Sequence, residues 1–298
     1  MPSSVQNESD SYRYDYVLDL NQESTASKLL RLVGRNKHVL ELGCATGSMT
    51  RILKEKLACR VTGVELDPVS AARAEPYCDT LFVGNLDHFD WTLLSSQTFD
   101  VILIADVLEH LRNPEDCLKQ LRLLLKPSGY LLISVPNIAY NGIIASLLLD
   151  DFPYAEIGLL DRTHIHFFTW KTLEKTLNHA LFSIVSQEMI IPVPEHPEFY
   201  AYWHALPLSL QHYLAQNPHG QVYQYIVQAI PEDAPKQFIP PEKKTQTTWL
   251  ETFQAQQNAF LQAQQELEQM RRSHSWKITA PLRAFGRLLQ FAKSIISK

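Results

Sequence analysis

The sequence predicts a doubly wound α/β fold, in which helices cover both faces of a mostly parallel sheet. Short runs rich in Val, Ile and Leu alternate with helical patterns from residue 24 to about residue 190. These runs are apolar almost throughout, as expected of strands that are buried on both faces. A loop with two glycines, at 43–47, follows the first run, where such sheets approach their ligands.

The order of elements supports one large domain over 1–232. The expected helices have apolar residues three or four positions apart and lie at 24–33, 48–57, 68–77, 114–125, 137–149 and 171–181. The seven expected strands are apolar and rich in β-branched residues, and they lie at 38–42, 60–66, 80–84, 99–106, 129–136, 182–191 and 221–230. An excursion rich in Pro and aromatic residues, at about 191–220, is interpreted as a lid or insertion over the site.

The C-terminal part reads as a linker at 233–246 and a helical tail at 247–298. Phe253, Phe260 and Leu267 have heptad spacing, so 247–270 is either a coiled coil that joins two copies or a solvated spacer helix. The last helix, within 273–298, has an apolar face and basic side chains. It either meets an anionic membrane surface or docks on protein.

Charge and cysteine usage narrow the function classes. The net charge is −5, but 271–298 holds seven basic residues and no acid, leaving 20 basic against 32 acidic residues before it. Such an acidic body is a poor partner for nucleic acid, because that affinity depends largely on Lys and Arg. The four cysteines lack C-x-x-C spacing, which favours reduced thiols in the cytoplasm over a disulfide or zinc framework. No apolar leader or run of eighteen apolar residues suggests secretion or membrane spanning.

Five motifs follow one another at the ends of the expected strands: ELGCATG (41–47), TGVELDP (62–68), GNLD (84–87), FDVILIADVLEHL (99–111) and LKPSGYLLISVPN (125–137). In this order they resemble the class I S-adenosylmethionine-dependent methyltransferases, over roughly residues 12–230. A G-x-G-x-x-G dinucleotide motif is absent from the first loop. The resemblance implies a Rossmann-like methyltransferase sheet, S-adenosylmethionine as cofactor, and an enzyme.

The resemblance also implies roles for the residues at these strand ends. Glu41 would lie near the cationic methionine end of the cofactor, and Glu65 would accept both ribose hydroxyls. Leu66 would lie against the adenine, and Asn85 would accept from its amino group where the family often has Asp. The other implied cofactor-binding residues come from the first loop and the later motifs: Gly43, Cys44, Ala45, Gly47, Leu86 and Asp106.

Three histidines are candidates for a general base beside the acceptor. His164 and His166 alternate with apolar residues, so both imidazoles would share one face of an extended segment; His110 follows Glu109. The alternative is structural, with Asp161, Arg162 and His164 forming a hydrogen-bonded corner. No metal is expected, because no third ligand stands at a suitable spacing from the H-x-H pair.

Two further segments of the sequence bear on which molecule accepts the methyl group. The segment DRTHIHFFT (161–169) resembles one in methyltransferases of bacterial surface-glycan pathways, and SHSWKITAPLR (273–283) resembles a segment of polysaccharide-assembly proteins. These resemblances favour O-methylation of a glycan or lipid-linked sugar at the inner face of the membrane. The alternatives are a methyltransferase of a small metabolite or quinone-type lipid, and a catalytically silent cofactor-binding scaffold in a glycan-assembly complex.

Overall fold

The computed structural model describes residues 18–192 and 196–234, together with Gln262 and Gln269. The chain divides into two compact units, Met1–Glu242 and Lys243–Lys298. In the second unit the two described residues are helical and exposed. The expected coiled coil and basic terminal helix otherwise lie outside the described residues, and both stay predictions.

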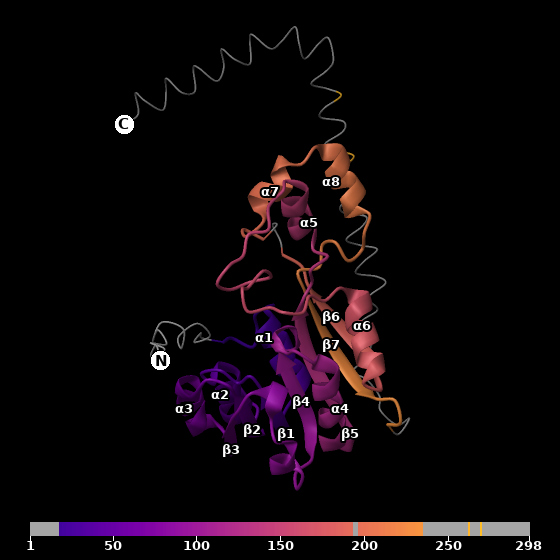
Figure 1. Cartoon of the computed structure of the whole chain (residues 1–298). Helices are drawn as coiled ribbons and strands as arrows, with labels where there is room; N and C mark the ends of the chain where they lie inside the picture. The colour runs from indigo at the N-terminus through magenta and orange to yellow at the C-terminus, as the bar shows by residue number, and fades with distance from the viewer. Residues whose placement is uncertain (1–17, 193–195, 235–261, 263–268, 270–298) are drawn as a thin grey trace, which may run out of the picture. The chain divides into compact units, whose positions relative to one another are not determined.

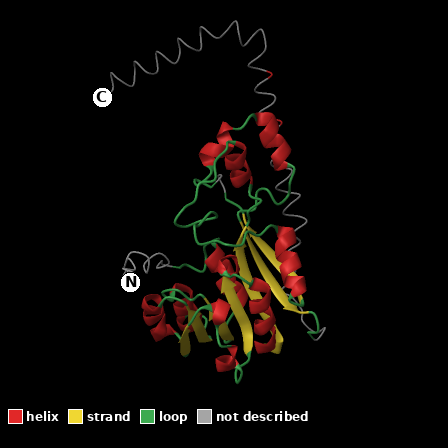
Figure 2. Ribbon diagram, in the orientation of Figure 1, coloured by secondary structure: helices red, strands yellow, loops and turns green. Residues whose placement is uncertain are grey.

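One seven-stranded sheet forms the centre of the first unit (Figure 1; Figure 2). Its strands are β1 (His38–Leu42), β2 (Arg60–Glu65), β3 (Thr80–Val83), β4 (Phe99–Ala105), β5 (Leu125–Pro136), β6 (Phe182–Ile190) and β7 (Gln224–Pro231). They lie in the order β3-β2-β1-β4-β5-β7-β6. Strands β1 to β5 are parallel, and β7 is antiparallel to both β5 and β6. The predicted α/β class and mostly parallel sheet are confirmed.

The helices alternate with these strands along the chain. They are α1 (Thr25–Val33), α2 (Ser48–Glu55), α3 (Pro68–Ala74), α4 (Pro114–Leu124), α5 (Asn141–Leu148), α6 (Trp170–His179), α7 (Tyr200–Ala205) and α8 (Leu208–Ala215). Short 3-10 turns include η3 (Leu86–His88) and η5 (Leu108–His110), which follow β3 and β4. The described residues contain no helix long and apolar enough to cross a membrane.

Capping side chains fix where several helices begin. Asp67 accepts from the backbone N–H of Ser70 at 2.8 Å, and a proline occupies the first position of α3. Thr169 and Thr172 form a reciprocal capping box at α6. Since α3 begins directly after β2, its cap also holds the end of that strand in place.

Two apolar layers hold the sheet between helices. On one face, α1 and α2 bury residues such as Leu29 and Leu53 against the sheet. On the other face, α4 and α6 bury residues such as Leu121 and Leu177. The strands are therefore covered on both sides, which explains their continuous apolar sequences.

The helices α5, α7 and α8 gather beyond one end of the sheet (Figure 1). A small separate core joins α5, the 159–160 loop and the start of α7. Phe199 is 1% exposed in this core, and it lies so close to Gly142 that a Cβ on that glycine would be 2.4 Å from the Phe199 Cβ. The described part of 191–220 thus packs as a helical insertion. Its action as a lid stays a prediction.

Candidate active site

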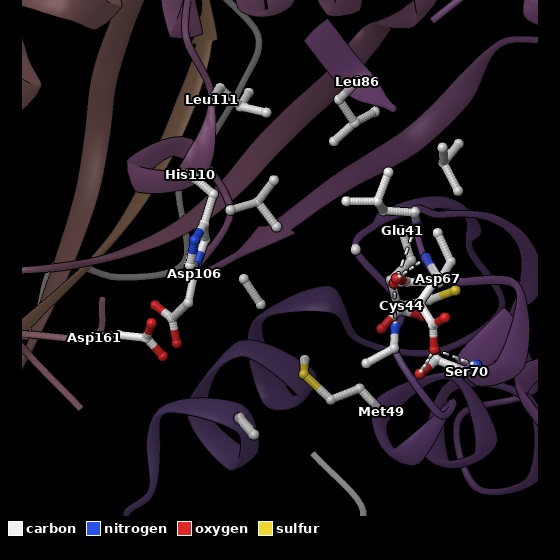
Figure 3. A pocket seen from close by; sticks show the side chains of 18 of the residues that line it. Glu41, Cys44, Met49, Asp67, Ser70, Leu86, Asp106, His110, Leu111 and Asp161 are labelled. Carbon is white, nitrogen blue, oxygen red and sulfur yellow. Dashed lines mark hydrogen bonds between the residues drawn. The ribbon is translucent and has the colours of Figure 1, made fainter. Parts of the chain in front are cut away.

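A cavity of about 580 Å³ lies at the carboxyl ends of β1, β2 and β4. Figure 3 shows that its labelled polar side chains form two groups. Glu41, Cys44, Asp67 and Ser70 lie on one side, and Asp106, His110 and Asp161 lie on the other. The volume falls within the range of about 300–1,000 Å³ that is usual for small-molecule sites.

The loop after β1 has the backbone conformation that its glycines permit. Gly43, Ala45 and Gly47 have φ angles of +66°, +47° and +84°. A Cβ on Gly43 would lie 2.8 Å from Val107 Cγ2, so only glycine allows this approach between the first and fourth strand ends. The loop therefore forms a close-fitting wall of the cavity.

Glu65, at the end of β2, is tied to three backbone amides. Its Oε2 accepts from the N–H of Ala45 at 2.8 Å. Its Oε1 accepts from Leu66 at 2.8 Å and from Asp67 at 2.9 Å. A carboxylate has about four acceptor sites, so one remains for a ligand hydroxyl. Accepting both ribose hydroxyls, as predicted, requires exchange of one backbone bond.

Glu41 is buried beneath the loop and accepts from the Thr50 hydroxyl at 2.7 Å. Burial raises its pKa to about 7, and the nearby Glu65 carboxylate acts in the same direction. Cys44, which follows Gly43 in the loop and also lines the cavity, is buried as well. A hydrogen bond with Cys78 and burial raise the pKa of its thiol, so it behaves as a small apolar side chain.

The part of the cavity expected to hold adenine is lined by apolar side chains and by one amide. Leu66 lines the cavity although the residue is 64% exposed, and Leu86 lines it as well. The Asn85 amide oxygen accepts from the backbone N–H of Asp87 at 2.9 Å, which caps η3. This oxygen keeps a second lone pair for a ligand.

Asp106 follows β4 in a left-handed conformation, with a φ of +53°. It lines the cavity, and its Oδ1 accepts from the Ser134 hydroxyl at 2.7 Å and from the Gln224 side-chain amide at 2.6 Å. Residues on β5 and β7 thus fix its position. A strained conformation held by two neighbours is typical of functional sites.

His110 and His164 lie together on the same side of the cavity. Their ring centroids are 4.8 Å apart, and both rings line the cavity. Nδ1 of His110 hydrogen-bonds to the carbonyl of Thr163 at 3.2 Å, and Nδ1 of His164 hydrogen-bonds to the carbonyl of Leu159 at 3.2 Å. A carbonyl can only accept, so each Nδ1 carries the proton and each Nε2 is left with a lone pair when the ring is neutral. Burial lowers the pKa of His164, which keeps it neutral.

Two of the predicted site residues, Gly47 and His166, do not line the cavity in the described structure. Gly47 packs on α3, where its Cβ would lie 2.8 Å from the Ala74 Cα. His166 hydrogen-bonds through Nε2 to the carbonyl of Arg112 at 3.1 Å. His164 and His166 therefore both face 109–112, but only His164 reaches the cavity.

Several lining residues were not predicted from the sequence. Gln224 begins β7, Tyr223 directly precedes that strand, and 157–159 come from the loop before Asp161. Asp161 was considered only as a structural corner, and its Oδ1 does accept from the Thr163 hydroxyl and N–H. For Tyr223 and Gln224, the signal in the sequence is that two neighbouring polar side chains precede the apolar run 225–227.

The donors and acceptors of the cavity fit the expected cofactor. Glu65 offers an acceptor for a ribose hydroxyl, the exposed Leu66 offers an apolar surface for adenine, and the absent Cβ of Gly43 leaves room for close approach. Glu41 can carry a negative charge toward the cationic methionine end. These groups would hold S-adenosylmethionine.

Comparison with known proteins gives the family. The family described as "Methyltransferase domain" matches residues 18–187. The mitochondrial ubiquinone biosynthesis O-methyltransferase of Schizosaccharomyces pombe is 32% identical over 103 residues, which are 33% of this chain and 37% of that protein. The malonyl-[acyl-carrier protein] O-methyltransferase of Halalkalibacterium halodurans is 27% identical over 180 residues, which are 54% of this chain and 64% of that protein. The chain thus spans 37% and 64% of the length of these two relatives, which is less than two thirds in each case.

Among solved structures, an S-adenosylmethionine-dependent methyltransferase from Mesorhizobium loti aligns with a TM-score of 0.48 and 20% identity. The alignment covers 71% of this chain and 99% of that one. The family match covers more than half of the chain and includes the β1 loop, Glu65 and the β4 end. This protein therefore belongs to the methyltransferase-domain family.

Proposed function

We propose that this protein transfers a methyl group from S-adenosylmethionine to a hydroxyl oxygen of a saccharide, in the cytoplasmic synthesis of a bacterial surface glycan. The observation that carries the proposal is the polar wall formed by Asp106, His110 and Asp161, across the cavity from Glu41 and Cys44 (Figure 3). Carboxylates and imidazoles recognise hydroxyl groups well. The sequence resemblances at 161–169 and 273–283 supply the link to glycans.

The residues of this wall would position the acceptor and take its proton. When bound, the cofactor supplies a methyl group on a positively charged sulfur, which is a good leaving group. The protein's task is then to align the acceptor oxygen and exclude water. A neutral imidazole Nε2 on His110 or His164 can accept the hydroxyl proton, a step usually worth about 10²–10⁴-fold in rate.

A phenolic hydroxyl of a quinone-type lipid is the second candidate acceptor. Several relatives are ubiquinone biosynthesis O-methyltransferases, including those of Schizosaccharomyces pombe and Coxiella burnetii. The cavity also has apolar lining residues, among them Leu111, Ile157 and Leu159. A ring acceptor would lie against these side chains while its hydroxyl reached the polar wall.

An assay of methyl transfer to two matched extracts tests both candidate acceptors. The protein and S-adenosylmethionine labelled in the methyl group are incubated with a glycan-precursor fraction or a quinone-precursor fraction, and products are identified by mass spectrometry. We expect a methyl ether in the glycan fraction with the wild type and none with Glu65→Ala. Label in the quinone fraction alone would favour the second candidate. Tight cofactor binding with no product in either would favour the scaffold alternative.

A further inference from the structure

Glu109 is a buried carboxyl group directly behind the polar wall, and within the described part of the chain no hydrogen bond reaches its side chain. The residue is 1% exposed, and neither carboxylate oxygen hydrogen-bonds to another described residue. An uncompensated buried carboxylate is costly, so such a group usually meets a proton or a cation. The neighbouring carboxylates Asp106 and Asp161 add to the negative charge here, since both raise the pKa of Glu109 after burial itself.

His110 and His164 each place a ring nitrogen near this carboxylate. One ligand atom from each of Glu109, His110 and His164 lies within 4.8 Å of the others. The His164 Nε2 is 4.0 Å from the Glu109 Oε1, which is too long for a hydrogen bond. The two groups therefore face each other at a distance longer than a hydrogen bond.

We propose that Glu109, His110 and His164 bind a divalent first-row transition-metal ion, such as Mn²⁺ or Zn²⁺. Ligand atoms about 2.1 Å from one ion are separated by about 3 to 4 Å. The three groups, whose ligand atoms now lie within 4.8 Å of one another, would therefore need to close by roughly 1 Å, a shift that side-chain rotation can supply. Two imidazoles and one carboxylate are a set that such ions favour over Mg²⁺ or Ca²⁺.

The outer hydrogen bonds of the two histidines support the proposal independently. Metal-bound histidines almost always donate their other ring N–H to a carboxylate or a backbone carbonyl. Here Nδ1 of His164 hydrogen-bonds to the carbonyl of Leu159. Nδ1 of His110 lies 3.2 Å from the Thr163 carbonyl and 3.1 Å from the Thr163 hydroxyl, whose own proton goes to Asp161. This arrangement orients both Nε2 atoms before any ion binds. The H-x-H pair considered in the sequence is not the site, because His166 bonds to Arg112 instead.

The ion would serve the acceptor side of the proposed reaction, and this role rests on that function. His110 and His164 line the cavity, so coordination positions not filled by protein would face the acceptor. With the ion bound, His110 and His164 would act as its ligands and not as the general base. A hydroxyl bound to the ion would be held in place and would lose its proton to water more readily. Acceptors with two neighbouring oxygens, such as a sugar diol or a catechol, would then be preferred.

Metal binding is measured on the full chain without a histidine tag, after treatment with EDTA. Mn²⁺ is added alone, and free Mn²⁺ is followed by electron paramagnetic resonance. We expect about one tight equivalent for the wild type and binding about 100-fold weaker for Glu109→Gln. Glu115→Gln is the matched control, because Glu115 also pairs with a histidine, His179, but on the exposed surface of α4 and α6. It should bind like the wild type.

A second variant and a second measurement show whether weaker binding by Glu109→Gln comes from loss of a ligand or from misfolding. His110→Ala should also lose Mn²⁺, and Co²⁺ should give a visible spectrum in the wild type that both variants lack. Equal Mn²⁺ binding by wild type and Glu109→Gln, or no binding by the wild type, would overturn the site. Methyl transfer is scored separately, so metal binding without product would count against the proposed function and leave the site standing.

Discussion

The carboxylate of Glu65 accepts a 2.8 Å hydrogen bond from the backbone N–H of Ala45, which joins the end of β2 to the loop after β1. Ala45 holds a left-handed conformation that alanine rarely adopts, and this bond helps to maintain it. Glu65 therefore has two roles, since it shapes the loop as well as facing the cavity. The loop and the acid form one cofactor-binding unit.

Glu65→Ala removes both roles at once. We expect the affinity for S-adenosylhomocysteine to fall by about 10–100-fold, the range given by losing hydrogen bonds to a charged group. Isothermal titration calorimetry measures this loss. Glu55→Ala, an exposed acid on α2 outside the cavity, is the control and should bind normally. Unchanged affinity in Glu65→Ala would contradict the assignment.

Ala45→Gly should stabilise the protein. A left-handed alanine costs about 1–2 kcal/mol, while glycine loses about 0.5–1 kcal/mol of extra conformational freedom on folding. The net gain is therefore between about 0 and 1.5 kcal/mol, seen as a higher urea midpoint. Gly47→Ala should act in the opposite direction, because its φ is +84° and its Cβ would meet the Ala74 backbone. A lower urea midpoint for Ala45→Gly would show that the loop needs its methyl group.

The parallel half of the sheet and the cofactor end were predictable because they depend on local signals. Continuous apolar strands, the glycines at 43 and 47, and the acid that ends β2 each follow from neighbouring residues in the chain. The order of these signals was sufficient to place Glu41, Glu65 and Asp106 around one cavity, where the structure has them.

The acceptor end depends on contacts that periodicity does not show. The strand at 221–230 was expected, but nothing in its sequence says that it inserts antiparallel between β5 and β6. This insertion brings Tyr223 and Gln224 to the cavity and Gln224 to Asp106. In the same way, the pairing of Glu109 with His164 joins residues 55 positions apart through a loop without regular structure.

Phe199→Ala should loosen the helical insertion and leave the sheet intact. Phe199 is buried in the small core of α5 and the 159–160 loop, so its loss should cost about 3–5 kcal/mol within that core. Limited proteolysis should then cut within 138–215, while hydrogen exchange in β1 and β4 stays slow. Tyr213→Ala, an exposed aromatic on α8, is the matched control. Faster exchange throughout the sheet would show instead that the insertion and the sheet unfold together.

Glu41 should make stability depend on pH. Its pKa is about 7 in the folded protein and near 4.5 when exposed, so the folded state holds the proton to higher pH. Unfolding then releases a proton between these values, and stability falls as pH rises from about 4.5 to 7, by about 3 kcal/mol from this group. Urea unfolding should show Glu41→Gln gaining on the wild type across this window. A constant difference between the two proteins would contradict the buried, protonated state.

The same proton should be released when the cofactor binds. Near pH 7 about half of the Glu41 side chains carry a proton, and a cationic ligand favours the ionised form. Calorimetry of S-adenosylmethionine binding at pH 7, in buffers of different ionisation enthalpy, should therefore report release of up to about half a proton. Glu41→Gln should report almost none. Equal proton release by wild type and variant would mean that Glu41 does not sense the cationic end, and the methionine portion would then have to lie elsewhere in the cavity.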